Sequence, residues 1–345
     1  MMHTVVQELK VDDAINHKLV YHVPSSNSLL FVKQSMPNRL YIWPLDKDAA
    51  PDAESLDCLE FDSSITAIGE CPGYILIGDS DGYVTMLSVG DMLGEPPAEP
   101  LYLDGSEVVK FKDCFVQTKV NWYRLNADYD ASINDVINNT PQPSLKIHRL
   151  EFPSQVNDLV RFDSLPSWPL EALSLNHPTE TLLCVGEDSP CMALYREDHE
   201  LNLSRLANVA LSIFTKKKEA KKLESTSMLL VERLDDPGRK LNVLFKLGRY
   251  VVACDFLRAQ LLFIEPVHML IVHHLKGYRD VVCWEADSNG GFYIVSNKRK
   301  VVEKWSTFEC LSKDTFAPNL QVICALDEQR VIALKGDSTL QLLSF

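Results

Sequence analysis

The sequence contains no apolar stretch that could cross a membrane or direct secretion. Its longest apolar region, residues 250–272, is interrupted by three charged residues and a proline, which a membrane-spanning helix does not tolerate. Residues 1–18 include three acidic side chains and no apolar core of signal-peptide length. We therefore expect a cytoplasmic protein without a transmembrane segment.

Positive charge is also scarce. The 345 residues include 34 Lys and Arg against 48 Asp and Glu, which gives a net charge of -14. Nucleic-acid binding needs a basic face that neutralises phosphates, and the only dense basic run is Lys216–Lys222. The composition therefore argues against a general nucleic-acid-binding protein.

Paired cysteines and catalytic motifs are absent as well. The nine cysteines form no CxxC spacing, and an odd number partly inside apolar runs indicates reduced core thiols. No phosphate-binding loop, nucleophile elbow or zinc-binding helix motif occurs. His268, His273 and His274 have no acidic or cysteine partner at ligand spacing, so we expect no catalytic, metal or cofactor site.

What the sequence does contain is a repeated unit of short strands and polar turns. Residues 276–305 show it most clearly: an apolar start at Val281, a turn at Gly290 and Gly291, a strand over 292–296, and a strand ending at Trp305. Related patterns recur, and their ranges are 28–45, 65–89, 170–195, 240–265 and 320–345. The Asp79–Gly82 turn is the sharpest hairpin signal, and paired carboxylates such as Asp79 and Asp81 are interpreted as turn residues.

The spacing of these units predicts a β-propeller. A blade cannot bury both faces alone, so its sequence repeats about every 40 to 50 residues. The inner turns near residues 257, 298 and 337 are 41 and 39 residues apart. Wider gaps leave room for a poorly defined unit over 108–152 and for insertions at 126–143 and 201–238. We predict one all-β domain over 1–345, a seven-bladed WD-type propeller with helical or disordered insertions.

A propeller ring closes by pairing strands from the two ends of the chain. Because the last predicted strand, residues 339–345, stops at the C-terminus, closure is expected to use residues 5–9 or 19–23. If neither segment serves, the chain is a fragment of a longer protein.

The second part of the chain resembles a known family. The pentapeptide KGYRD (Lys276–Asp280) follows a lysine-rich stretch at 215–224 and a strand pair at 250–264, and precedes a strand, a basic turn and a strand ending in Trp305. This order is similar to the N-terminal propeller region of the non-catalytic regulatory subunit of the heterodimeric Rab GTPase-activating complex associated with exocytosis. The family's subunits are much longer than this chain, and residues 1–201 resemble them only as a generic propeller.

The resemblance implies specific partners. It implies a catalytic subunit that carries the GTPase-activating residues, a Rab GTPase, and a role in Rab cycling that includes nucleotide exchange on an endoplasmic-reticulum Rab. A cytoplasmic location with peripheral association at the endoplasmic reticulum would follow. The chain itself would then act as a non-catalytic scaffold in vesicle trafficking.

Two stretches are candidate partner contacts. The first is Tyr278, Arg279 and Asp280. Arg279 could act as an arginine finger, although a simpler interpretation is that it fixes an inter-blade turn through an ion pair or backbone hydrogen bonds. Tyr278 is interpreted mainly as a packing residue. The second is Lys216, Lys217 and Lys218, which could contact acidic lipid or an acidic partner, although a solvated insertion suffices.

Two other functions remain open on the sequence alone. One is an unrelated WD-type scaffold, for example in trafficking or ubiquitin ligation. The other is an enzyme with a site in the central channel, which we disfavour because no acidic or histidine residue recurs at the strand starts.

Overall fold

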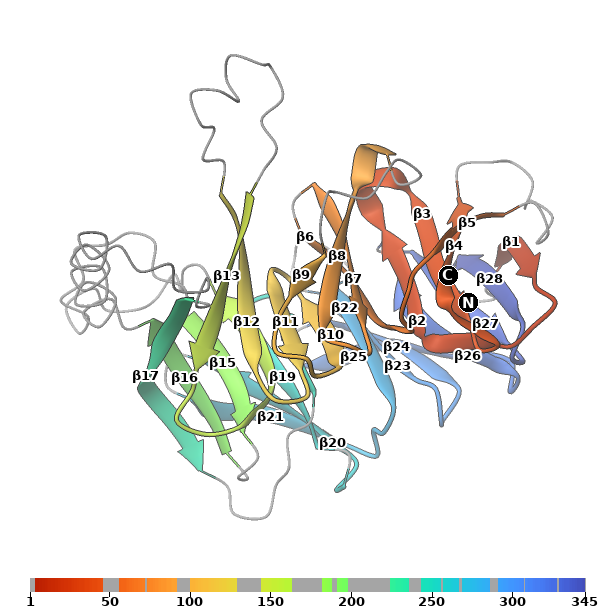
Figure 1. Ribbon diagram of the computed structural model, residues 1–345. Helices are drawn as coiled ribbons and strands as arrows, with labels where there is room; N and C mark the ends of the chain where they lie inside the picture. Colours follow the sequence, from red (N-terminus) through yellow and green to blue (C-terminus); the bar gives the residue numbers. More distant parts are fainter. Residues whose placement is uncertain are drawn as a thin grey trace, which may run out of the picture.

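The computed structural model is an all-β propeller. Its described residues are 4–45, 56–71, 73–91, 100–128, 144–162, 182–187, 191–197, 224–235, 243–255, 257–266, 269–285, 291–306, 308–327 and 329–344. These residues form six hydrogen-bonded sheets around a common axis (Figure 1). The helices among them are two single 3₁₀ turns, η1 at Pro24–Ser26 and η3 at Val89–Asp91. Within the described ranges no helix has the length and hydropathy needed to cross a bilayer.

Two four-stranded blades follow the closing strand of the ring in the N-terminal part of the chain. The first consists of β2 (Ile15–Val23), β3 (Ser28–Lys33), β4 (Met36–Pro44) and β5 (Asp57–Glu60). The second consists of β6 (Ile65–Cys71), β7 (Tyr74–Asp79), β8 (Tyr83–Ser88) and β9 (Leu101–Tyr102).

The third sheet is twice as wide. Its strands, in spatial order, are β10 (Val108–Lys112), β11 (Phe115–Thr118), β12 (Trp122–Asp128), β13 (Ser144–Glu151), β17 (Glu224–Asp235), β16 (Cys191–Glu197), β15 (Leu182–Glu187) and β14 (Val156–Phe162). Two four-strand halves meet where β13 and β17 pair in parallel, from His148 opposite Glu224 to Glu151 opposite Ser227.

Three further blades complete the ring. The fourth consists of β18 (Val243–Leu247), β19 (Tyr250–Asp255), β20 (Gln260–Glu265) and β21 (Leu270–Lys276). The fifth consists of β22 (Val281–Glu285), β23 (Gly291–Ser296), β24 (Val301–Ser306) and β25 (Glu309–Thr315). The sixth consists of β26 (Leu320–Ala325), β27 (Arg330–Lys335), β28 (Thr339–Ser344) and the N-terminal strand β1 (Thr4–Lys10).

The predicted number of blades is wrong. The structure has six blades instead of seven, because β13 and β17 join what spacing would count as separate units into one eight-stranded sheet. The predicted helix within 201–238 falls on residues 201–223, outside the described residues, and β17 occupies 224–235. Of the insertion predicted at 126–143, the described part continues strand β12 to Asp128.

The apolar patterns place the core between blades. The second and third strands of a blade lie between neighbouring sheets, so β3 is buried at every position and β20 at all but its last. Outer strands contact only one neighbour, so β25 is exposed at all but one position. Buried Leu, Ile, Val and Phe side chains from adjacent sheets form continuous clusters, such as Val252 and Phe263 with Phe292 and Ile294.

The Asp79–Gly82 hairpin forms as the sequence predicts. One Asp79 carboxylate oxygen accepts hydrogen bonds from the backbone N–H groups of Asp81 and Tyr83, both at 2.9 Å. Gly82 has φ of +85°, a conformation that costs glycine little. The Asp79 carboxylate therefore stabilises this turn, as interpreted from the sequence, whereas the Asp81 carboxylate accepts a hydrogen bond from the Ser63 hydroxyl at 2.6 Å.

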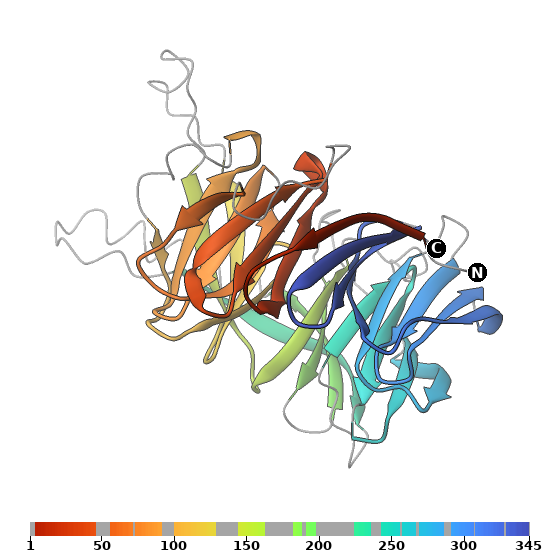
Figure 2. The same ribbon diagram turned by 90° about the vertical axis from the view of Figure 1, so that its right-hand side faces the viewer.

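The ring closes through the N-terminal strand. β1 pairs antiparallel with β28, from Thr4 opposite Ser344 to Lys10 opposite Thr339, and Figure 2 shows the two strands side by side. This is one of the two closures expected from the sequence. Leu9 of β1 is 1% exposed and packs in a cluster with Leu340 and Leu342.

Truncation of Leu9 tests how much the closure stabilises the ring. We expect Leu9→Ala to cost about 2 to 5 kcal/mol, because it removes buried contacts and leaves a cavity. Val6→Ala is the matched control: Val6 lies at the bulge of the same strand and is 51% exposed, so its effect should stay within about 0.5 kcal/mol. Urea unfolding followed by tryptophan fluorescence measures both. Equal midpoints for the two variants would contradict a stabilising closure.

A single carboxylate organises the connection from β9 to β10. Asp104 accepts hydrogen bonds from Ser106 (2.6 Å), Thr118 (2.8 Å), Asn121 (2.8 Å) and Tyr123 (2.9 Å). Burial alone would raise the pKa of this carboxyl, but the hydrogen bonds outweigh it and lower the pKa to about 2. The charged form therefore ties the connection to the wide sheet.

This lowered pKa predicts a pH dependence of stability. The folded pKa lies below the ordinary value of 3.8, so the stabilisation is complete above that value and is lost as the pH falls from about 4 towards 2. In Asp104→Asn this contribution is missing at every pH. The variant should therefore have a lower thermal midpoint near pH 6, and the difference from wild type should shrink below pH 4. A difference that stays constant with pH would contradict the assignment.

Candidate functional site

The KGYRD segment forms the turn between β21 and β22, where one blade passes to the next. Gly277 has φ of +89° and Asp280 has φ of +57°. The backbone N–H groups of Gly277 and Tyr278 donate to the Ala259 carbonyl at 2.6 and 3.0 Å. On the other side, the Asn297 N–H donates to the Asp280 carbonyl at 3.2 Å. Backbone hydrogen bonds to both blades therefore fix the turn.

Tyr278 anchors this turn in the protein. Its side chain is 6% exposed, and its hydroxyl donates to the buried carboxylate of Glu303 on β24. Lys313 donates to the other Glu303 oxygen at 2.7 Å, and the Arg299 guanidinium lies 5.1 Å from the Tyr278 ring centre. The residue is therefore part of the packing between blades, in agreement with the simpler interpretation.

Burial and hydrogen bonding shift both pKa values in this group. Burial, and then the hydrogen bond to Glu303, raise the pKa of Tyr278. Burial would raise the pKa of Glu303, but hydrogen bonds from Lys313 and Tyr278 and the positive charges of Lys313 and Arg299 lower it overall. A neutral tyrosine thus donates to a charged carboxylate, which is a strong arrangement.

Arg279 and Asp280 are exposed side chains on this fixed backbone. The Arg279 carbonyl accepts a hydrogen bond from the Ser296 hydroxyl at 3.4 Å, whereas the two charged groups form no ion pair with any described residue. Backbone hydrogen bonds hold the turn, and both charged side chains are exposed to solvent. A contact role for them remains a prediction. Lys216, Lys217 and Lys218 lie outside the described residues.

A second feature, which the sequence reasoning missed, is a cavity of about 750 Å³ at one end of the propeller axis. Its lining residues come from β2, β6, β10, β14 and β18, most of them near the end of the strand. Its polar lining residues carry opposite charges on different strands: Glu70 on β6 and Asp113 after β10, against Arg161 on β14 and Lys246 on β18. The cavity could bind a ligand that carries both charges.

A buried ion cluster fixes one wall of this cavity. Asp158 on β14 is 2% exposed; it accepts a hydrogen bond from Lys112 on β10 at 3.0 Å and forms an ion pair with Lys110 of the same strand at 3.1 Å. The Leu244 N–H on β18 donates to the same carboxylate at 2.8 Å, and Lys112 donates to the Leu244 carbonyl at 2.6 Å. Burial lowers the pKa of Lys112, and the charge of Asp158 opposes that shift. The cluster therefore joins three inner strands.

The sequence carries a weak signal for this cluster. Lys110 and Lys112 alternate within a strand pattern, and Asp158 interrupts an apolar run. Alternation places both lysines on one face of β10. Their acidic partner, however, lies 46 residues after Lys112 in the sequence. Only the ring geometry brings them together.

The described side chains include no group of three His, Cys, Asp or Glu residues placed to hold a metal ion. His273 stacks on Phe308 with ring centres 4.8 Å apart, and it lies 5.8 Å from the Phe263 ring. Burial lowers its pKa. The cysteines whose side chains the structure describes are free thiols: Cys58, Cys71, Cys114, Cys254, Cys283, Cys310 and Cys324.

Comparison with known proteins identifies the fold. No protein-family model matches the chain, and no curated protein sequence matches it either. Solved structures do match over nearly its whole length. A chain of the mitotic checkpoint complex is 10% identical with a TM-score of 0.58, covering 99% of this chain and 94% of that one.

Two further structures give the same result. The WD40 β-propeller domain of Doa1 is 11% identical with a TM-score of 0.56, covering 99% and 97% of the two chains. BBS1N, solved in complex with ARL6DN, is 9% identical with a TM-score of 0.54, covering 100% and 95%. The fold is therefore a WD40-like β-propeller, as predicted apart from the blade count.

Variants of the KGYRD turn test whether Tyr278 stabilises the fold while Arg279 does not. Tyr278→Phe should lower the free energy of unfolding by about 1 to 3 kcal/mol, because it leaves the buried Glu303 carboxylate without one donor. Arg279→Ala should stay within about 0.5 kcal/mol of wild type, because its side chain is exposed. Chemical denaturation measures both. A larger loss for Arg279→Ala than for Tyr278→Phe would reverse the assigned roles.

Proposed function

We propose that this chain is a non-catalytic protein-interaction scaffold. The observation that carries the proposal is the exposed pair Arg279 and Asp280 on a turn held by backbone hydrogen bonds and by buried Tyr278. Because the backbone of this turn is already fixed, a partner does not have to order it on binding, and only the side chains lose conformational entropy. Such a surface binds a partner without changing its backbone conformation, as is expected of a rigid propeller.

The narrower candidate is the regulatory subunit of a Rab GTPase-activating complex. Its support is the resemblance of Lys276–Asp280 and its flanking strands to that family. In this proposal the chain holds a catalytic subunit and a Rab GTPase in register, in the cytoplasm and at the surface of the endoplasmic reticulum. The charged turn, together with Lys216–Lys218, would provide contacts.

Co-purification with the catalytic subunit of that complex tests the narrower proposal. We expect the two purified proteins to elute together, and the mixture to stimulate nucleotide exchange on an endoplasmic-reticulum Rab more than either protein alone. Failure to associate would exclude the Rab role but leave the scaffold proposal standing, to be tested with whichever partner the chain binds stably.

Removal of the two displayed charges should then weaken that association. We expect Arg279→Ala combined with Asp280→Ala to raise the Kd at least tenfold, as removal of a charged contact at an interface centre does. Lys119→Ala is the control: its side chain is 62% exposed and pairs with Glu107, the residue before β10. Calorimetry measures both, with circular dichroism to check folding. Equal weakening by both variants would argue for a non-specific charge effect.

A further inference from the structure

The outer strand of each four-stranded blade has an edge that no strand of that blade covers, and such edges are protected in most soluble proteins. Most of the described outer edges show a form of protection. In the wide sheet, β13 and β17 pair with each other. β5 and β9 are short, at four and two residues. β1 has a bulge and ends in charged residues, and β25 carries Glu309, Lys313 and Asp314.

The outer edge of β21 is more open than these. It shares with β1 and β25 a shift in register, at Val272, and it ends in Lys276, but it carries no acidic residue and is longer than β5 and β9. It is seven residues long, its sequence is LIVHHLK, and its side chains alternate strictly between exposed and half-buried positions. On its inward face, His273 stacks on Phe308. On its outward face, Leu270 is 58% exposed and Val272 is 43% exposed. No other described strand pairs with this edge.

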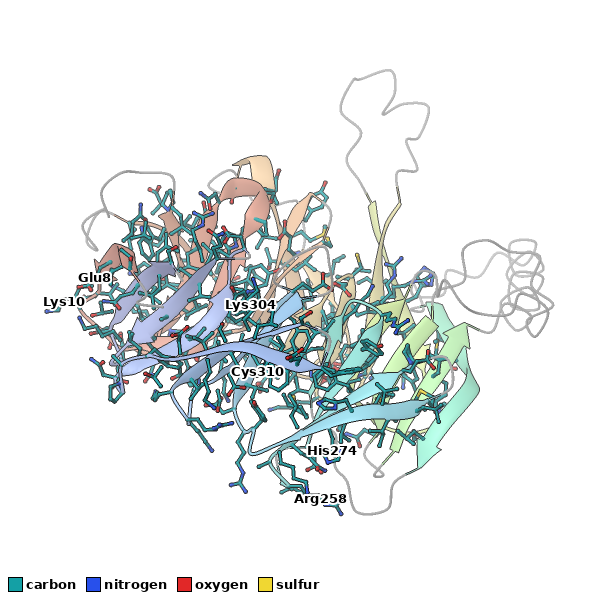
Figure 3. The ribbon with its side chains drawn as sticks, turned by 180° about the vertical axis from the view of Figure 1, so that it is seen from behind. Glu8, Lys10, Arg258, His274, Lys304 and Cys310 are labelled. Carbon is teal, nitrogen blue, oxygen red and sulfur yellow. The ribbon has the colours of Figure 1, made fainter. Side chains whose placement is uncertain are left out.

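The same edge changes from apolar to basic along its length. His274 and Lys276 follow Leu270 and Val272 on the exposed face. Arg258, in the turn before β20, lies towards the same end, as the labelled side chains in Figure 3 show. β21 carries no acidic residue, in a chain with a net charge of -14. Local positive charge on such a background favours a partner of opposite charge.

We propose that the edge of β21 binds an extended segment of a partner protein, which adds a strand to this blade. The segment carries alternating apolar side chains opposite Leu270 and Val272, and Asp or Glu side chains opposite His274 and Lys276. Main-chain hydrogen bonds supply affinity in this mode of recognition, and the alternate side chains supply specificity. The parallel pairing of β17 on β13 is a precedent within the same molecule for strand addition at an outer edge.

This site rests on the proposed scaffold function. It adjoins the KGYRD turn at Lys276 but does not use the Arg279 and Asp280 side chains, so either contact can fail without the other. The probes are two fluorescent peptides of about eight residues, each with two valines and two glutamates at alternate positions between threonines. One peptide has the valines first and the other has the glutamates first, which covers parallel and antiparallel addition. We expect one order to bind and to protect the amides of residues 270–276 from hydrogen exchange.

Matched variants decide the outcome. Val272→Lys, on the exposed face, should weaken binding at least tenfold, and peptides with lysine in place of glutamate should weaken it to a similar degree. Leu311→Lys is the control, because Leu311 is 56% exposed on β25, the outer strand of the next blade, and should leave binding unchanged. Circular dichroism checks the folding of both variants.

Three results overturn the proposal. The first is absence of binding by both peptide orders. The second is binding that Val272→Lys leaves unchanged or that Leu311→Lys weakens equally. The third is a concentration-dependent dimer in sedimentation that Val272→Lys abolishes, because that result assigns the edge to a second copy of this chain.

Discussion

The pairing of β1 with β28 is the constraint on which the rest of the structure depends. Each blade presents its faces to two neighbours, so an open ring would leave an apolar face in water at both ends. The antiparallel register from Thr4 to Lys10 closes the ring with residues from opposite ends of the chain. Because closure fixes the inner strands relative to each other, Asp158 can meet lysines from one strand and a backbone N–H from another.

The sequence predicts the inner and middle strands well and the outer strands poorly. Strands such as β3 and β23 are apolar runs between polar turns, so composition and period identify them. The ECLSKDT sequence of β25 has no buried face and therefore no pattern. The blade count was wrong for a related reason: spacing counts repeated units, whereas the pairing of β13 with β17 depends on edges that meet only in the folded ring.

The candidate sites show the same division. A contiguous motif, KGYRD, marks the turn at an inter-blade junction, although only the structure separates buried Tyr278 from exposed Arg279. The axial cavity receives one to three residues from each of several strands, including Glu70 and Arg161, which are far apart in the sequence. Without a repeated motif at the strand ends, a site of this kind cannot be found by reading along the chain.

Closure also determines where this protein can recognise a partner. The middle strands are buried between blades and are unable to rearrange without opening the ring, so recognition is left to turns, the axial cavity and outer edges. The KGYRD turn and the β21 edge are both of this kind, and both use backbone geometry fixed by their blades. Interfaces on such surfaces form with little backbone movement. A scaffold of this type would therefore act by holding partners at set positions, and the distance between its contact surfaces would be part of its function.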